Sequence, residues 1–299
     1  MATALITEHH LKNLAGFDAW DDARILDTLQ AGQERAIAAV RKAAPQIAAA
    51  ARCVATQINA GGRLAYAGAG TSLRIGVQDG AELPATFGLE EDRLLYLLAG
   101  GRAAIFETLA DAEDDAEAGR KAASVLKSSD VLIAVAASGR TPYTVAAAEE
   151  ARARGCPVIA VVNNAGSPLA AAADVEVVLG SGPEIIAGST RMGAGTAQKA
   201  ALNMISTLAF TRLGAVHDGY MVNVQAGNEK LRQRAAHIVA AIAHVELGAA
   251  ELALTACHNQ IKPAVLLCKG EGSYAAAQEK LAEANGNLRL ALSKLEGRE

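Results

Sequence analysis

The chain has 299 residues, which is enough for one large domain with a smaller one, or for two domains. With 51% hydrophobic and 20% charged residues, its composition is typical of a soluble globular protein. A net charge of −4 and an aromatic content of 3% leave neither a basic surface for a nucleic-acid backbone nor many rings to stack on bases. We therefore expect no nucleic-acid partner.

The potential metal ligands are dispersed along the chain. The four cysteines form no CxxC pair, so neither a zinc site nor a disulfide framework is expected, and the six histidines are scattered as well. The N-terminus lacks a secretory pattern, and no apolar run approaches the roughly 18 residues of a membrane span. We expect a cytoplasmic protein with no metal site and no membrane partner.

Residues 1–60 are rich in alanine, with leucine, isoleucine and valine at helical spacing and an interruption near Pro45. This pattern predicts an N-terminal helical segment that packs on the core. Because an alanine-rich helix approaches its neighbours closely, this segment is also one candidate surface for a dimer partner.

Residues 61–228 change to a pattern of short apolar runs separated by helix-length stretches. The runs span residues 64–67, 94–98, 131–136, 158–162 and 175–179. Near-continuous apolar strands alternating with helices predict a parallel sheet covered on both faces. We expect an open, doubly wound α/β domain with about five strands, and ligands at the carboxyl ends of those strands.

Residues 229–299 are predicted to form a small helical bundle after a long helix over 189–213. Turn signals at Gly248, Lys262–Pro263, Gly270–Gly272 and Asn285–Asn287 divide this region into short amphipathic pieces. We expect the bundle to have a structural role.

A glycine loop follows the first predicted strand. Gly70, Thr71 and Ser72 come directly before a helix that Pro84 is expected to close. The unpaired N–H groups and positive dipole of a helix N-terminus favour an anion, and the two hydroxyls add donors. A tight turn with a capped helix explains the pattern equally well. Leu73 stands where a dinucleotide-binding loop has its third glycine, so a phosphosugar or mononucleotide fits better than NAD.

Two further loops repeat this arrangement. The residues Ser138, Gly139, Arg140 and Thr141 precede Pro142 at a strand-to-helix junction, where helix capping is a sufficient alternative explanation. A third hydroxyl cluster, which opens the long helix, contains Ser189, Thr190 and Arg191. Because loops at the ends of parallel strands meet in one crevice, we expect all three to contribute to a phosphate and substrate site.

Two glutamates are candidates for acid and base chemistry. Glu82 lies in an apolar helix, where burial would raise its pKa and suit it to donate a proton. Glu113 lies in an acidic run that a solvated helix face also explains. Asp79, one turn before Glu82, is expected to have a structural or orienting role.

Several stretches together resemble one enzyme family. They are GAGTSLRIGVQDGAELPATFG, AGGRAAIFETLADAED, AASGRTPY, GPEIIAGSTRMGAGTAQKAALNMIST, YMVNVQAGNEKL, HNQIKPAVLL and ANGNLRLAL. In this order and at compatible spacing they resemble the N-acetylmuramic acid 6-phosphate etherases. These are enzymes with a sugar isomerase (SIS) domain, and they are related to the glucokinase regulatory protein.

The resemblance implies a reaction on an aminosugar phosphate: removal of D-lactate from the 3-ether to give N-acetylglucosamine 6-phosphate, in cell-wall sugar recycling. It implies no cofactor, a homodimer whose sites are completed by the neighbouring subunit, and catalysis by Glu82 and Glu113. By resemblance Glu82 is the proton donor and Glu113 the base, although the pair is better defined than the division of roles.

The chain departs from the family pattern at several positions. These are Leu11, Leu73, Gly80–Ala81, Ala85, Gly193 and Asn223. Because the loops and glutamates match the family while positions around them differ, two alternatives stay open. One is a related lyase or isomerase that acts on another aminosugar 6-phosphate. The other is a non-catalytic sugar-phosphate sensor, which would not need both glutamates.

Overall fold

The computed structural model describes residues 5–295 and 297, and it divides into two compact units. Unit 1 runs through Ala81 and resumes over Asp92–Leu208, whereas unit 2 comprises Glu82–Glu91 and the chain from Ala209 onward. The boundary falls inside two helices. The three-part division at 1–60, 61–228 and 229–299 stays a prediction, because these units are defined by internal contacts alone.

The N-terminal region is helical. Three 3₁₀ turns, η1 (Ile6–Glu8), η2 (Lys12–Leu14) and η3 (Phe17–Ala19), lead into α1 (Asp22–Lys42) and α2 (Ala44–Asn59). The side chain of Asp21 caps α1 by accepting from the Arg24 N–H at 3.0 Å. Pro45 lies in the first turn of α2, where its missing N–H has no intrahelical partner to lose. The predicted interruption near Pro45 is confirmed.

A five-stranded parallel sheet forms the centre of unit 1. Its strands are β1 (Leu64–Gly68), β2 (Leu94–Leu98), β3 (Val131–Ala136), β4 (Val158–Val162) and β5 (Val175–Val178). They are ordered β2-β1-β3-β4-β5, and Tyr66 is in register with Tyr96 on one side and Ile133 on the other. Every residue of β1, β3 and β4 is buried, as the continuous apolar runs predicted.

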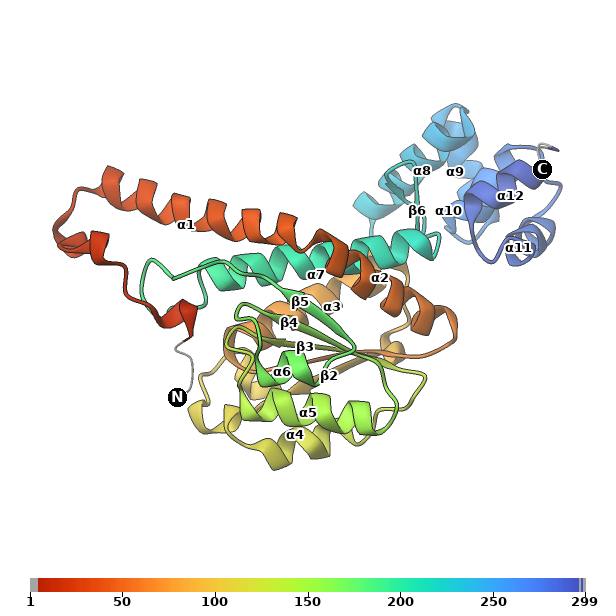
Figure 1. Ribbon diagram of the computed structural model, residues 1–299. Coiled ribbons are helices and arrows are strands. Elements are labelled where there is room, and N and C mark those ends of the chain that lie inside the picture. Colours follow the sequence, from red (N-terminus) through yellow and green to blue (C-terminus); the bar gives the residue numbers. More distant parts are fainter. Residues whose placement is uncertain (1–4, 296, 298–299) are drawn as a thin grey trace. The chain divides into compact units, whose positions relative to one another are not determined.

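Helices cover both faces of the sheet, so the doubly wound α/β prediction is confirmed. Figure 1 shows α4 (Ala116–Ala123) and α5 (Pro142–Ala153) on one face, and α2, α3 (Gly70–Phe87) and α7 (Gly193–Arg212) on the other. The short α6 (Pro168–Ala171) follows β4, and the turns η4 (Glu91–Arg93), η5 (Gly101–Ile105) and η6 (Ala110–Glu113) flank β2. Gly119 permits the close approach of α4 and α5, because a Cβ there would lie 2.2 Å from the Tyr143 carbonyl oxygen.

Helix α3 is longer than the sequence predicted. Pro84 lies inside the helix, which continues to Phe87, so the expectation that Pro84 closes it is wrong. The Gly88 N–H donates to the Pro84 carbonyl at 3.0 Å, and Gly88 has φ +72°. A left-handed glycine is a common helix terminator, and here it ends the helix.

Unit 2 contains a small hairpin and the helical bundle. The hairpin pairs β6 (Val216–His217) with β7 (Tyr220–Met221), and the bundle contains α8 (Glu229–Ala243), α9 (Leu247–Ala256), α10 (Ile261–Cys268), α11 (Tyr274–Glu283) and α12 (Leu288–Leu295). The helical region was predicted, but the hairpin was not. Its turn, Asp218–Gly219, has positive φ at both residues, which is the geometry of a type I′ turn.

No single helix among the described residues is long and apolar enough to cross a membrane. The pair α8 and α9 meets the length and composition criteria only jointly, and it is bent by 110°.

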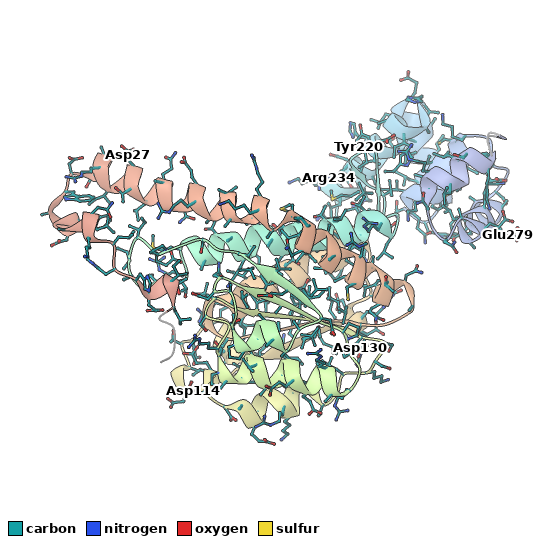
Figure 2. All side chains as sticks on the ribbon, viewed as in Figure 1. Asp27, Asp114, Asp130, Tyr220, Arg234 and Glu279 are labelled. Carbon is teal, nitrogen blue, oxygen red and sulfur yellow. The ribbon has the colours of Figure 1, made fainter. Side chains whose placement is uncertain are left out.

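A buried carboxylate fixes the starts of β1 and β3. Asp130 is 1% exposed and accepts hydrogen bonds from the Arg63 guanidinium (2.7 and 3.2 Å), the Arg63 N–H (3.0 Å) and the Lys127 N–H (2.9 Å). Burial by itself would raise the pKa of Asp130, but these donors outweigh it and lower the pKa below the usual value. Figure 2 shows Asp130 at one end of the sheet and Asp114 at the other.

We expect Asp130→Asn to lower the free energy of unfolding by about 2 kcal/mol near pH 7, because it leaves buried donors without their charged acceptor. Since the folded-state pKa is lowered, the wild-type advantage is present above the unfolded-state pKa near 3.8 and declines as the pH falls through the folded-state value. Urea denaturation from pH 3 to pH 7 measures this. Asp27→Asn, at an exposed position on α1, is the control, and equal stabilities of both variants would contradict the assignment.

Candidate active site

A cavity of about 330 Å³ lies at the carboxyl ends of β1 and β3. In the strand order, the connection from β1 leads to β2 on one side, and the next leads to β3 on the other, so the topological switch point lies between β1 and β3. Doubly wound sheets bind their ligands at this point. Four segments line it, from the N-terminus, the loop after β1, the turn η6 and the loop after β3, together with Thr190. All its lining residues belong to unit 1: Leu5, Thr7, Glu8, Ala69–Ser72, Glu113, Asp114, Ala136–Ser138, Arg140–Pro142 and Thr190.

The loop after β1 presents the N-terminus of α3 to this cavity. Gly70 has φ +54°, and Thr71 is half-buried. Ser72 is buried, and its hydroxyl donates to the Gln198 side-chain oxygen at 3.0 Å, while Gln198 donates in turn to Asn163 at 3.0 Å. The Ser72 proton is therefore engaged inside the protein. The groups that this loop can offer to an anion are the backbone N–H groups of Gly70–Ser72 and the Thr71 hydroxyl.

The loop after β3 presents the N-terminus of α5. Thr141 is the cap residue, yet its side chain makes no capping hydrogen bond, so capping does not account for it. The Ser138 hydroxyl accepts from the Arg140 N–H at 3.1 Å and so shapes the turn. Gly139 has φ +64°, and a Cβ at this position would lie 2.1 Å from the Ser167 hydroxyl oxygen. Only glycine fits there, which brings the backbone of this loop against Ser167.

The third loop is arranged differently from the other two. The N-terminus of α7 is occupied by the chain's own Glu184, whose carboxylate accepts from the N–H groups of Gly193 (2.9 Å) and Ala194 (2.8 Å). Glu184 is buried, so this helix terminus already holds an anion. Thr190 lines the cavity, whereas Ser189 and Arg191 are not among its lining residues.

Sequence reasoning did not place the N-terminal segment in the site. The Ile6 N–H donates to the Asn164 side chain at 2.9 Å, and the Gly188 N–H donates to the Thr7 carbonyl at 3.0 Å. These bonds hold Glu8 at the cavity, where a Cβ on Gly188 would lie 2.6 Å from its carboxylate. Nothing local in the sequence links this segment to Asn164 or Gly188, its partners in the fold.

The two candidate catalytic glutamates fall in different units. Glu113, on η6, is exposed and lines the cavity beside Asp114. Glu82 lies on the part of α3 that belongs to unit 2 and is exposed, so the expected burial is wrong for the single chain. The apolar residues around Glu82 in sequence face other directions, as Leu83 illustrates with 2% exposure.

Asp79 is the centre of a buried hydrogen-bond network in unit 1. Its carboxylate accepts from Tyr66 (2.8 Å), Asn203 (2.7 Å) and Ser206 (3.1 Å), which joins α3 to β1 and α7. Burial raises the pKa of Asp79, and the three donors offset only part of that rise. The orienting role predicted for Asp79 fits these contacts and stays a prediction.

Leu73 and Gly80 are two of the departures from the family pattern that lie in unit 1. Leu73 is buried and is not among the lining residues of the cavity. Gly80 faces the Tyr66–Tyr96 pair, whose ring centroids are 6.1 Å apart, and a Cβ there would lie 2.6 Å from the Tyr96 hydroxyl. The glycine therefore accommodates a tyrosine.

Comparison with known proteins finds relatives that match most of the chain. The SIS domain model matches residues 29–163. A relative from Symbiobacterium thermophilum, named N-acetylmuramic acid 6-phosphate etherase, is 45% identical over 88% of each chain. A protein of the same name from Deinococcus radiodurans is 43% identical over 96% of this chain and 95% of its own.

The chain belongs to the N-acetylmuramic acid 6-phosphate etherase family. Its fold is shared with a solved structure from Bacteroides fragilis described as a phosphosugar isomerase involved in capsule formation. That structure has a TM-score of 0.51 and 19% identity, covering 68% of this chain and 98% of its own. The fold and family expected from the sequence are both confirmed.

We expect Gly139→Ala to lower the free energy of unfolding by about 2–4 kcal/mol, because the added methyl group meets Ser167 and the residue must keep a left-handed φ. Gly166→Ala is the matched control, since Gly166 also has φ +64° but a Cβ there would have no atom within 4 Å. Urea denaturation of both variants isolates the steric part, and equal losses would show that the Ser167 contact is unimportant.

Proposed function

We propose that this protein cleaves the D-lactyl ether of N-acetylmuramic acid 6-phosphate, yielding N-acetylglucosamine 6-phosphate and D-lactate, as the names of its relatives indicate for them. One observation carries the proposal: in a chain of this family, the N-termini of α3 and α5 and the carboxylate of Glu113 line one cavity. The proposed setting is the recycling of cell-wall sugars in the cytoplasm.

The phosphate fits the two helix N-termini. Backbone N–H groups at Gly70–Ser72 and Ser138–Thr141, with the hydroxyls of Thr71 and Thr141, can surround an anion without a lysine. Gly139 contributes by shaping its loop, Ser72 acts through its backbone, and Arg140, which lines the cavity, brings a positive charge. Of the third cluster, we propose that Thr190 contacts the sugar, because it lines the same cavity.

The reaction follows from the chemistry of the open-chain sugar. Its aldehyde acidifies the C2 proton, which one carboxylate removes while the C3–O bond breaks and a second carboxylate protonates the departing lactate oxygen. Water then adds at C3 of the unsaturated intermediate, so all atoms are accounted for. We assign Glu113 as the base because it lines the cavity, and Glu82 as the proton donor.

We further propose that Glu82 reaches the site of a second copy of the chain. Glu82 is exposed in the single chain, whereas a general acid that acts near neutral pH is expected to be buried. A homodimer in which each subunit supplies Glu82 to its partner's cavity would bury it.

The two alternative functions, a related lyase or isomerase and a sensor, predict different experimental results. Since Leu73 and Gly193 are not among the residues lining the cavity, these two departures give no direct support to a different sugar substituent. A related lyase or isomerase would turn over another aminosugar 6-phosphate, and a sensor would bind one without turnover.

Purified protein incubated with N-acetylmuramic acid 6-phosphate is expected to release D-lactate, measured with a lactate dehydrogenase assay. Glu82→Gln and Glu113→Gln should each reduce kcat about 100- to 10,000-fold, because each removes a proton-transfer group. Glu117→Gln, at an exposed position on α4 outside the cavity, is the matched control. Binding of the substrate without lactate release by the wild type would contradict the etherase.

Mixed dimers test the shared site. If Glu82 and Glu113 act from different subunits, co-expressed Glu82→Gln and Glu113→Gln chains form mixed dimers with one intact site, and activity returns to about a quarter of wild type. If both act from one subunit, no intact site forms. A mixture that stays as inactive as either variant, with mixed dimers verified by mass spectrometry, would refute the shared site.

A further inference from the structure

Unit 2 contains a second cavity, of about 700 Å³, formed entirely by its own residues. Three segments and Gly88 surround it: residues 222–226 after the hairpin, residues 258–263 at the start of α10, and part of α11 with Gly286 beyond it. The volume lies within the range of small-molecule sites. Neither the proposed reaction nor the candidate catalytic residues account for it.

Lys262 is the charged group of this cavity. It is 9% exposed, and its ammonium donates to the Gly286 carbonyl at 2.6 Å, which uses one of its three hydrogens. The cavity lining contains no aspartate or glutamate, and among the described residues no carboxylate lies within 4 Å of the Lys262 nitrogen. Burial lowers the pKa of Lys262 to about 8. A buried cation without a counter-charge is costly unless an anion joins it.

The rest of the lining suits a polar molecule that carries the anion. Five amide side chains surround the cavity: Asn223, Gln225, Asn259, Gln260 and Gln278. Gln260 precedes α10 but does not cap it with its side chain. Its oxygen instead accepts from Gln278 at 2.8 Å and Tyr274 at 3.2 Å. The first N–H groups of α10 therefore have no side-chain cap, and α10 also carries Lys262.

We propose that this cavity binds a small organic anion, a sugar acid or sugar phosphate, whose carboxylate or phosphate pairs with Lys262 and the N-terminus of α10. The amide side chains receive its hydroxyl groups, and Ile261 and Leu281 supply the apolar part of the wall. This site is separate from the cavity of unit 1 and does not depend on the etherase reaction.

Lys262 also has a simpler role to be tested against this one. Its bond to Gly286 ties α10 to the turn between α11 and α12, and such a tether would need no ligand. Variants that block the cavity but leave Lys262 in place separate the two roles. Ala282 is exposed and lines the cavity, so Ala282→Trp obstructs it, while the exposed Ala275 on the same helix is outside it and provides the control Ala275→Trp.

The experiment is isothermal titration of the full chain with three probes: D-lactate, inorganic phosphate and N-acetylglucosamine 6-phosphate. A Ser138→Ala background weakens binding in unit 1, so the two cavities are distinguished. We expect at least one probe to bind the background protein, with Lys262→Met and Ala282→Trp each weakening it about tenfold or more, and Lys269→Met and Ala275→Trp leaving it unchanged.

The probes also separate the source of the anion. Binding of D-lactate identifies a carboxylate ligand, whereas phosphate and the sugar phosphate together identify a phosphorylated one. The proposal is overturned if no probe binds at millimolar concentration, or if binding is lost on Ser138→Ala and insensitive to Ala282→Trp. Circular dichroism of each variant verifies folding, and lower stability of Lys262→Met without any probe binding establishes the tether alone.

Discussion

The parallel pairing of β1 with β2 on one side and β3 on the other determines where chemistry can occur in unit 1. Two helices leave the sheet from adjacent strands, and their N-termini meet where the paths of the chain diverge. Because an α-helix leaves its first N–H groups unpaired, this arrangement brings two sets of donors to one place before any side chain is considered. Asp130 fixes the opposite ends of β1 and β3, so the relative register of these loops depends on a buried ion pair with Arg63 at the far end of the sheet.

Local sequence patterns were sufficient to predict the sheet and the positions of the loops after β1 and β3, since apolar runs and the residues after them are local features. The exceptions involve partners distant in sequence. The sequence around Ser72 predicts that its hydroxyl binds a phosphate, but this hydroxyl donates its hydrogen bond to the side chain of Gln198. The third loop has the pattern of another anion site, yet Glu184 fills the helix terminus. Nothing near Ser72 or Gly193 in the sequence specifies these partners.

Other differences between the predicted and the observed structure concern local features: the end of α3, the hairpin and the exposure of Glu82. Pro84 is a helix breaker on average, but the signal that ends α3 is the left-handed Gly88. The Asp218–Gly219 dipeptide is a strong hairpin signal, but it lies between two stretches that were predicted to be helical. Glu82 was expected to be buried because its neighbours are apolar. Adjacent residues of a helix point in different directions, however, so one can be exposed while the next is buried.

The buried charges of the two units differ in how they are compensated. Asp130 has a guanidinium and two N–H groups, Glu184 has two N–H groups at a helix terminus, and Asp79 has three side-chain donors. Each acid therefore has enough hydrogen-bond donors to stabilise its position without a ligand. Lys262 has a single carbonyl oxygen and faces a cavity without acidic residues. The contrast between these acids, which each accept several hydrogen bonds, and the Lys262 ammonium, which donates to one carbonyl oxygen, supports the proposal that an anion binds beside Lys262.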